Sequence, residues 1–182
     1  MLVALGFTKT SERVIHQENW FTFLAAEFDG PAGERIERYV FRHPGAVGVV
    51  PIDGDDVVLV RQFRPAVEME MLELPAGKLD VSGEAPADAA RRELVEEAGL
   101  DAPEMVELTR FHNSAGFSDE LTIVYLATNL IPTKPMAVSV EERYLSVERV
   151  PLDQVLRLVA DGTITDAKTV IGLLTALRYL DR

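Results

Sequence analysis

With 182 residues, 47% of them hydrophobic and 26% charged, the chain is long enough for one globular domain and too short for two ordinary ones. It contains no cysteine, which excludes disulfides, thiolate metal sites and a cysteine nucleophile and agrees with a cytoplasmic location. The net charge of -12 would repel the backbone of a nucleic-acid polymer, whereas a small anionic ligand could bind through divalent cations held by acidic side chains.

The first third of the chain is predicted to consist mainly of strands. Its N-terminus lacks the basic flank and the cleavage site of a signal peptide, and no apolar run approaches the length of a bilayer span, so we expect no membrane partner. Turn residues at Asp29-Gly30 and at Asp53-Gly54-Asp55 separate the apolar runs. The strands are expected at residues 20–28, 35–42, 46–52 and 57–62.

The rest of the chain mixes strands with three helices. The clearest helix begins near Pro86, where proline suits the first turn, and ends at Gly99, with Leu94 and Ala98 on its apolar stripe. An irregular loop is expected before it, from Pro75 to about Glu84. Strands are expected at 70–74, 105–112, 121–128 and 144–149, and the other helices at 152–160 and 166–180. This order predicts an α+β fold, a mixed sheet between helices in an α/β/α sandwich, preceded by antiparallel N-terminal strands.

Three glutamates share one face of the helix that ends at Gly99. Glu93, Glu96 and Glu97 are three and four residues apart, so their carboxylates project from the side opposite the apolar stripe. Crowded carboxylates repel one another unless a cation neutralises them, and oxygen ligands suit a hard ion such as Mg²⁺. A solvated helix face, its charge offset by neighbouring arginines, is the alternative that the cluster by itself leaves open.

The residues around this cluster form a longer motif. Gly77 and Glu84 precede the run from Arg92 to Leu100, which reads Arg-Glu-Leu-Val-Glu-Glu-Ala-Gly-Leu. The series resembles the Nudix box: a glycine, a glutamate and, after seven residues, Arg-Glu-aliphatic-x-Glu-Glu-x-Gly-aliphatic. The match is complete from Glu84 onward. The loop from Lys78 to Gly83 has six residues where the box has five, an insertion of the kind that loops absorb.

The resemblance to the Nudix box implies a metal site for Mg²⁺, with Mn²⁺ as a substitute. It makes Glu93 and Glu97 the principal ligands, Glu96 a shared or outer ligand, and Ala76 a ligand through its backbone carbonyl. Glu97 and Arg92 would take part in catalysis, and Arg92 would also orient the carboxylates of this face.

Segments outside the box resemble the ADP-ribose pyrophosphatase branch of the Nudix hydrolases. The segments are residues 60–65, 73–80, 116–120 and 161–169. The resemblance implies that Arg64 contacts the phosphates of the substrate and that Glu120 approaches the bound ligand. It implies that Trp20 and Arg42 help to hold the adenine and its ribose across the interface of a homodimer.

The same branch carries a glutamate that orders or deprotonates the attacking water, in the loop before a late strand. The resemblance assigns this role to Glu142, with Glu141 as its rival. The implied reaction is Mg²⁺-dependent hydrolysis of ADP-ribose to AMP and ribose 5-phosphate. Residues 1–45 would form the dimer-forming strand region and residues 46–182 the Nudix catalytic domain.

Two alternatives to ADP-ribose hydrolysis stay open. Ala115 stands where the branch usually has a proline, which keeps a pyrophosphatase for another nucleoside diphosphate sugar in consideration. A Nudix-fold sensor that binds a nucleotide without cleaving it is the second alternative. The intact set of Glu93, Glu96 and Glu97 argues against the sensor, because a sensor can dispense with metal ligands.

Overall fold

The computed structural model describes residues 6–134 and 141–181, and side chains within residues 6–134 and 143–181. The chain divides into two compact units. The first comprises Met1–Gly45 and His112–Leu121, and the second comprises Ala46–Phe111 and Thr122–Arg182. Each unit has its own sheet, and each is described in turn.

An antiparallel sheet of three strands forms the first unit, in the order β1-β2-β3. The strands are β1 (Thr8–Gln17), β2 (Thr22–Asp29) and β3 (Arg35–Arg42). The segment 112–121 joins this sheet through Phe41, whose backbone N–H donates to the carbonyl of Phe117 over 2.8 Å. Strand β1 was not predicted, because all ten of its residues are exposed and its sequence therefore lacks an alternating apolar face.

A mixed sheet of seven strands forms the centre of the second unit, in the order β12-β5-β4-β10-β9, with β6 paired to β5 and β7 paired to β4. Strand β10 runs parallel to β4, whereas β5 runs antiparallel to β4, β6 and β12. The strands are β4 (Ala46–Asp53), β5 (Asp56–Arg64), β6 (Met69–Glu73), β7 (Ala76–Lys78), β9 (Glu104–His112), β10 (Leu121–Thr128) and β12 (Ser146–Pro151). A separate antiparallel pair consists of β8 (Leu100–Asp101) and β11 (Ile131–Pro132).

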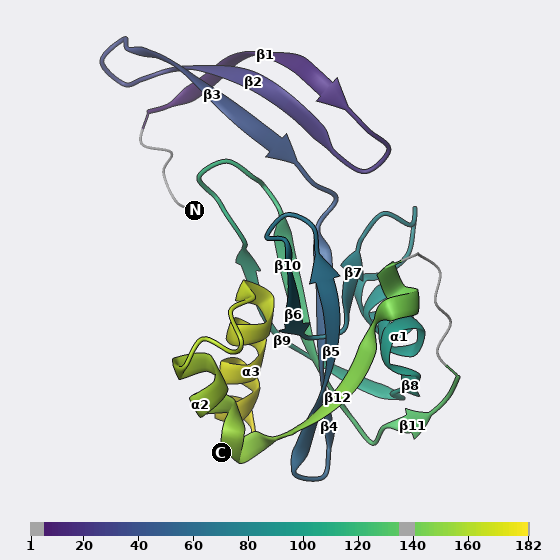
Figure 1. The fold of residues 1–182 in the computed structure, drawn as a ribbon. Coiled ribbons are helices and arrows are strands. Elements are labelled where there is room, and N and C mark those ends of the chain that lie inside the picture. Colours follow the sequence, from purple (N-terminus) through teal and green to yellow (C-terminus); the bar gives the residue numbers. More distant parts are fainter. Residues whose placement is uncertain (1–5, 135–140, 182) are drawn as a thin grey trace. The chain divides into compact units, whose positions relative to one another are not determined.

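Helices cover both faces of the seven-stranded sheet (Figure 1). The α-helices are α1 (Pro86–Ala98), α2 (Val155–Ala160) and α3 (Ala167–Tyr179), and the 3-10 helices are η1 (Glu141–Tyr144) and η2 (Leu152–Gln154). Because strand side chains alternate between faces, Val49 of β4 belongs to a buried cluster with Leu94 of α1, while Val50 belongs to one with Leu173 of α3. The predicted α+β sandwich with a mixed sheet is confirmed.

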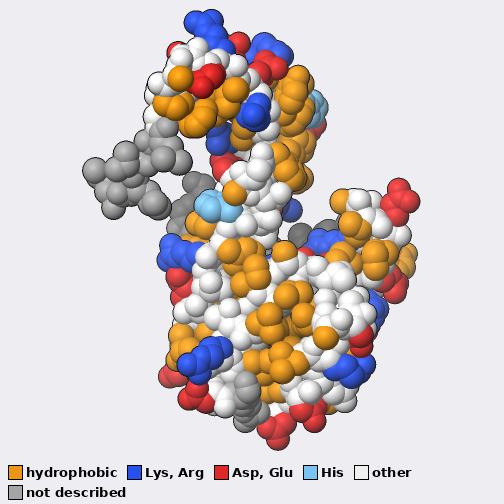
Figure 2. All heavy atoms as spheres, turned by 90° about the vertical axis from the view of Figure 1, so that its left-hand side faces the viewer, with side chains coloured by type: hydrophobic (Ala, Val, Ile, Leu, Met, Phe, Trp, Pro, Cys, Tyr) orange, Lys and Arg blue, Asp and Glu red, His pale blue; other side chains and the backbone are white. Residues whose placement is uncertain are grey.

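Helices α2 and α3 also carry exposed hydrophobic side chains, among them Leu156, Leu174 and Tyr179. Figure 2 turns this face of the second unit to the viewer, and hydrophobic side chains gather on it. No helix among the described residues is both long and apolar enough to span a bilayer.

Two local predictions were wrong. The segment predicted as a loop from Pro75 contains strand β7, whose residues Ala76 and Gly77 pair with Gly48 and Val47 of β4. The strand predicted at 144–149 lies at Ser146–Pro151, because Tyr144 ends a 3-10 helix. Both differences depend on backbone pairing with distant strands, which local sequence patterns do not report.

Candidate functional site

Helix α1 presents its glutamates in a fixed orientation because its apolar side is anchored to the sheet. Ala89, Ala90 and Leu94 are fully buried in the core below it. The helix begins at Pro86 and ends at Gly99, which adopts the left-handed conformation (φ 63°) and donates its N–H to the carbonyls of the preceding turn. Helix α1 lies beside strand β7 (Figure 1), and its polar side chains Glu97 and Arg92 contact Ala76 of β7 and Glu84 of the following loop.

Arg92 binds three carboxylates at once. Its Nε and Nη2 atoms donate to the two oxygens of Glu84 over 2.9 and 3.0 Å. Its Nη1 atom donates to Glu93 over 2.6 Å and to Glu96 over 3.1 Å. The pKa of Glu84 lies below its ordinary value because of the hydrogen bond from Arg92. The guanidinium therefore fixes two of the candidate metal ligands and the outer glutamate of the motif relative to one another.

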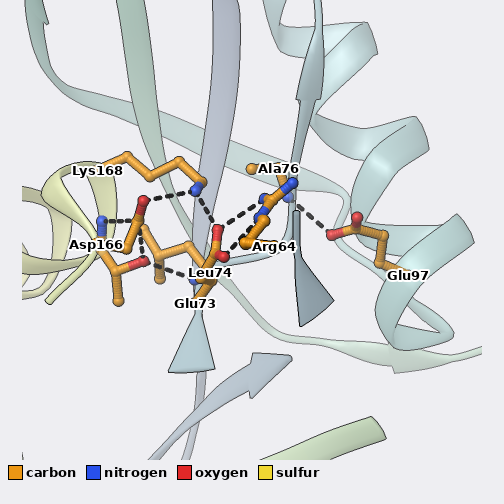
Figure 3. Close-up of polar contacts among 8 residues, drawn as sticks. Arg64, Glu73, Leu74, Ala76, Glu97, Asp166 and Lys168 are labelled. Atoms are coloured by element: carbon orange, nitrogen blue, oxygen red, sulfur yellow. Dashed lines mark hydrogen bonds and ion pairs between the residues drawn. The ribbon is translucent and has the colours of Figure 1, made fainter. Parts of the chain in front are cut away.

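Glu97 lies on the side of α1 that faces β7, and it is buried, with 8% of its surface exposed. One carboxyl oxygen accepts the backbone N–H of Ala76 over 2.9 Å, as Figure 3 shows. Burial, together with the nearby charge of Glu93, raises the pKa of Glu97 to about 8, against the lowering effect of the hydrogen bond from Ala76. A buried carboxyl of this kind ionises readily when a cation lies beside it.

Gly77 brings the backbone of β7 against the carboxylate of Glu93. A Cβ atom added at position 77 would lie 2.0 Å from the carboxyl carbon of Glu93, far inside contact distance. This glycine is therefore required by the approach of a charged side chain rather than by an unusual backbone angle. Ala76, immediately before it, pairs with Gly48 in the sheet, so the strand that bears the predicted carbonyl ligand is held in place.

The donor set around β7 and α1 fits a hard divalent cation. It consists of the carboxylates of Glu93, Glu96 and Glu97, with the backbone carbonyl of Ala76 as the predicted further donor, and oxygen donors of this kind are those that Mg²⁺ prefers. Across the described part of the chain, no three acidic or histidine side chains already converge on one point. The carboxylates of Glu93 and Glu96 turn toward Arg92 instead, so cation binding requires them to reorient.

Arg64 ends strand β5 beside this cluster and pairs with Glu73 of the neighbouring strand. Its Nε and Nη2 atoms donate to the two oxygens of Glu73 over 2.6 and 2.7 Å. Lys168 of α3 donates to the same carboxylate and pairs with Asp166 over 3.0 Å (Figure 3). The charge of Arg64 lowers the pKa of Glu97, so the arginine predicted to contact phosphates lies within electrostatic reach of one of the predicted metal ligands.

Three other predicted substrate contacts belong to the first unit. Arg42 ends β3 and donates to Asp119 over 3.1 Å, beside a cavity of about 390 Å³ that Ala115 also lines. Trp20 lies before β2 in an aromatic cluster and packs edge-on against Phe21 at 4.8 Å between ring centroids.

Glu120, the third, approaches His43, with 4.0 Å between Oε1 and the ring Nδ1. The side chains of Glu141 and Glu142, the predicted water-handling residues, lie outside the described residues; only their backbone, at the start of η1, is described.

Comparison with known proteins decides the family. A model of the NUDIX domain matches residues 42–171. The chain belongs to the Nudix family. An ADP-ribose pyrophosphatase of Bacillus subtilis is 38% identical to it over 175 residues, which cover 93% of this chain and 92% of the relative. A methanol dehydrogenase activator of Bacillus methanolicus is also 38% identical, over 151 residues that cover 82% of this chain and 79% of the relative.

A solved structure has the same Nudix fold. The crystal structure of an ADP compounds hydrolase matches with a TM-score of 0.85 and 24% sequence identity, covering 97% of this chain and 95% of that chain. The resemblance to the Nudix box and to ADP-ribose pyrophosphatases is confirmed by the domain match and by the Bacillus subtilis relative. Nudix hydrolases generally require divalent cations, which agrees with the oxygen donors around β7 and α1.

Two residues of the site were given no role by the sequence analysis. Glu73 and Lys168 stand far apart in sequence, and only the fold brings them together around Arg64. A signal for Glu73 was present, because a charged residue between Leu72 and Leu74 interrupts an apolar strand end. A buried carboxylate in such a position needs a cationic partner, but the sequence does not identify the side chain that pairs with it.

Proposed function

We propose that the protein hydrolyses the pyrophosphate bond of ADP-ribose, giving AMP and ribose 5-phosphate, in the cytoplasm. One observation carries the proposal: the carboxyl group of Glu97, in the Nudix box, and the guanidinium of Arg64 lie within electrostatic reach of each other in the second unit. A pyrophosphate needs both anion-binding donors and acids that hold cations. The name and the 38% identity of the Bacillus subtilis relative support ADP-ribose as the substrate.

The proposed cation is Mg²⁺, with Mn²⁺ as a substitute. Glu93 and Glu97 would hold it, with Glu96 as a shared or outer ligand and the carbonyl of Ala76 as a further donor. When bound, Mg²⁺ supplies charge neutralisation for phosphoryl oxygens and lowers the pKa of a water. Arg92 holds the carboxylates of Glu93 and Glu96 close to one another through its Nη1 atom, and both would turn away from the guanidinium to hold the cation.

The chain's own residues would then divide the remaining work. Arg64 donates to the phosphates and offsets the charge that develops on them. Glu142, with Glu141 as the alternative, accepts a proton from the attacking water. The water oxygen forms a bond to one phosphorus, and the bond from that phosphorus to the bridging oxygen breaks. The electron pair leaves with the second phosphate, so no covalent enzyme intermediate forms.

We further propose that residues 1–45 form a dimer-forming region and residues 46–182 the catalytic domain of a homodimer. Trp20, Arg42 and Glu120 would contact the adenine, the adjacent ribose and the rest of the ligand. Arg42 already lies beside a cavity in its own unit, and its side chain is 40% exposed and so accessible to an anion.

A related pyrophosphatase activity on another nucleoside diphosphate sugar is the second candidate. The observation that favours it is Ala115, which lines the cavity beside Arg42 and replaces the proline usual in the ADP-ribose branch. A small side chain at that place leaves room for a different sugar. The two candidates share the metal site and differ only in the residues that contact the sugar.

Product release from a panel of nucleoside diphosphate sugars with Mg²⁺ tests both candidates. A coupled phosphatase that acts only on monophosphate products reports each turnover. Preference for ADP-ribose supports the proposed function, and preference for a hexose conjugate supports the second candidate. Binding without turnover on any substrate would replace both with a nucleotide sensor.

A further inference from the structure

Glu73 is a fully buried acid that lies between two cations. Its side chain is 1% exposed, whereas that of Arg64 is 38% exposed and that of Lys168 is 13% exposed. Three N–H donors reach its two oxygens, two from Arg64 and one from Lys168. Asp166 pairs with Lys168, so the four groups together carry no net charge.

The pairing with Glu73 leaves one edge of the Arg64 guanidinium available. A guanidinium has five N–H donors in a planar fork, and Glu73 accepts from Nε and from Nη2. Both N–H groups of Nη1 and the second N–H of Nη2 are directed away from that carboxylate. Because Glu73 is buried and Arg64 is partly exposed, the edge that remains is the one that a phosphate can approach.

Glu73 is also tied to the backbone that continues into the metal-binding strand. The next residue, Leu74, donates its N–H to the hydroxyl of Thr169 over 3.0 Å, and that hydroxyl donates to Asp166 over 2.6 Å. The N–H of Ala76 donates to Glu97. Figure 3 shows the contacts from α3 to Glu73, Arg64 and Leu74 and, two residues further along the backbone, the separate hydrogen bond from Ala76 to Glu97 of α1. Displacement of Glu73 would therefore be felt by Arg64 and by the strand that bears Ala76.

Stability alone does not explain a buried ion pair at this position. Removing charges from water costs free energy, and well-packed apolar residues often stabilise a core as much as a buried ion pair does, or more. The residues before and after Glu73 in the sequence, Leu72 and Leu74, have buried apolar side chains. An apolar residue at position 73 would continue that pattern but would leave Arg64 free to rotate.

We propose that Glu73 is a positioning residue that aims the free edge of Arg64 at the phosphates of the substrate, while Lys168 balances its charge. This inference rests on the proposed function, because that function supplies the pyrophosphate that Arg64 binds. Lys168 contributes charge balance rather than substrate contact, because its ammonium group is already shared between Glu73 and Asp166.

A double-mutant cycle on Glu73 and Arg64 tests the proposal. We expect Glu73→Gln to lower kcat/KM for ADP-ribose about 10- to 100-fold, mainly through KM, because the arginine loses its fixed orientation. In an Arg64→Met background, the same change should cost no more than about twofold, because there is no guanidinium left to position.

Glu148→Gln provides the matched control. Arg61 of the same strand β5 and Glu148 of β12 form a similar two-point pair, over 2.5 and 3.2 Å, but the side chain of Glu148 is 36% exposed, whereas that of Glu73 is buried. We expect its replacement to leave kcat and KM unchanged. Equal effects of Glu73→Gln in the presence and in the absence of Arg64 would overturn the proposal.

A second variant distinguishes a misfolded protein from a folded protein in which Arg64 has lost its fixed orientation. Glu73→Gln combined with Lys168→Met removes one negative and one positive charge, so the cluster stays neutral and should melt cooperatively. This variant should still show the raised KM and weaker ADP-ribose binding by calorimetry with chelator present. Wild-type KM and affinity in this variant would contradict the proposal. A wild-type protein that neither binds nor cleaves ADP-ribose would instead overturn the proposed function and the ligand assigned to Arg64.

Discussion

The carboxylate of Glu93 occupies the space that a side chain at position 77 would need. The glycine at that position lets β7 and α1 approach so closely that an added Cβ atom would lie 2.0 Å from the Glu93 carboxyl carbon. The backbone of β7 is held by pairing with β4, so the glutamate rather than the strand would have to move. This one contact sets the distance between the two parts of the proposed metal site.

We therefore expect Gly77→Ala to lower kcat/KM about 100-fold, because a displacement of about 1 Å in a reacting group has an effect of this size. Steady-state kinetics with saturating Mg²⁺ measures it. Gly48→Ala is the matched control: it lies opposite Ala76 in the next strand, and its added Cβ would make only ordinary contacts, at 3.8 Å or more. An active Gly77→Ala enzyme would show that Glu93 is not a metal ligand in this geometry.

Replacement of Glu97 with glutamine should lower activity strongly without unfolding the protein. Glutamine keeps an oxygen that can accept the N–H of Ala76, so the local hydrogen bond survives. The loss of a charged ligand should lower kcat on the order of 100- to 1,000-fold. Thermal unfolding with and without Mg²⁺ provides the independent readout: Mg²⁺ should raise the Tm of the wild type but not that of the variant. Retained Mg²⁺ stabilisation in Glu97→Gln would remove this residue from the metal site.

Glu142→Gln should reduce turnover far more than substrate binding. A general base contributes about 100-fold or more to the chemical step, and its amide isostere cannot accept the proton of water. We expect kcat to fall by that factor with KM nearly unchanged, as measured by initial rates. Glu141→Gln is the neighbouring control and should keep most of the activity. The opposite ranking of the two variants would transfer the role to Glu141.

The charge of Asp166 should stabilise the fold down to acidic pH. Burial raises the pKa of this carboxyl, but Lys168 and the hydrogen bonds from Thr169 outweigh burial, so the pKa lies below its ordinary value of 3.8. A lowered pKa gives stability that is present above 3.8 and is lost as the pH falls through the folded-state pKa. Asn keeps the helix cap but not the charge, so Asp166→Asn isolates the contribution.

Urea unfolding of both proteins between neutral pH and about pH 2.5 measures this contribution. At neutral pH we expect the free energy of unfolding of the wild type to be larger than that of Asp166→Asn by on the order of 1 kcal/mol. We expect this difference in free energy to shrink below pH 3.8. A difference that stays constant through the acidic range would mean that the carboxylate is not stabilised by Lys168 in the folded state.

Local sequence patterns determined much of the architecture. The bounds of β3, α1 and β10 were predicted almost to the residue, because each has a clear period or a clear start and stop signal, such as Pro86 and Gly99. Strand β1 and the short strand β7 escaped prediction, because their formation depends on pairing with partners elsewhere in the chain.

The sequence by itself determined the chemistry of the site: the spacing of Glu93, Glu96 and Glu97 along one helix, with Gly77 and Glu84 before them, specifies an acidic face and its family. Only the tertiary structure decided what surrounds that face. It buried Glu97 against the backbone of Ala76 and joined Arg64 to Glu73. Helical spacing is a local property of the chain, whereas burial and ion pairing are set by which distant segments fold against each other.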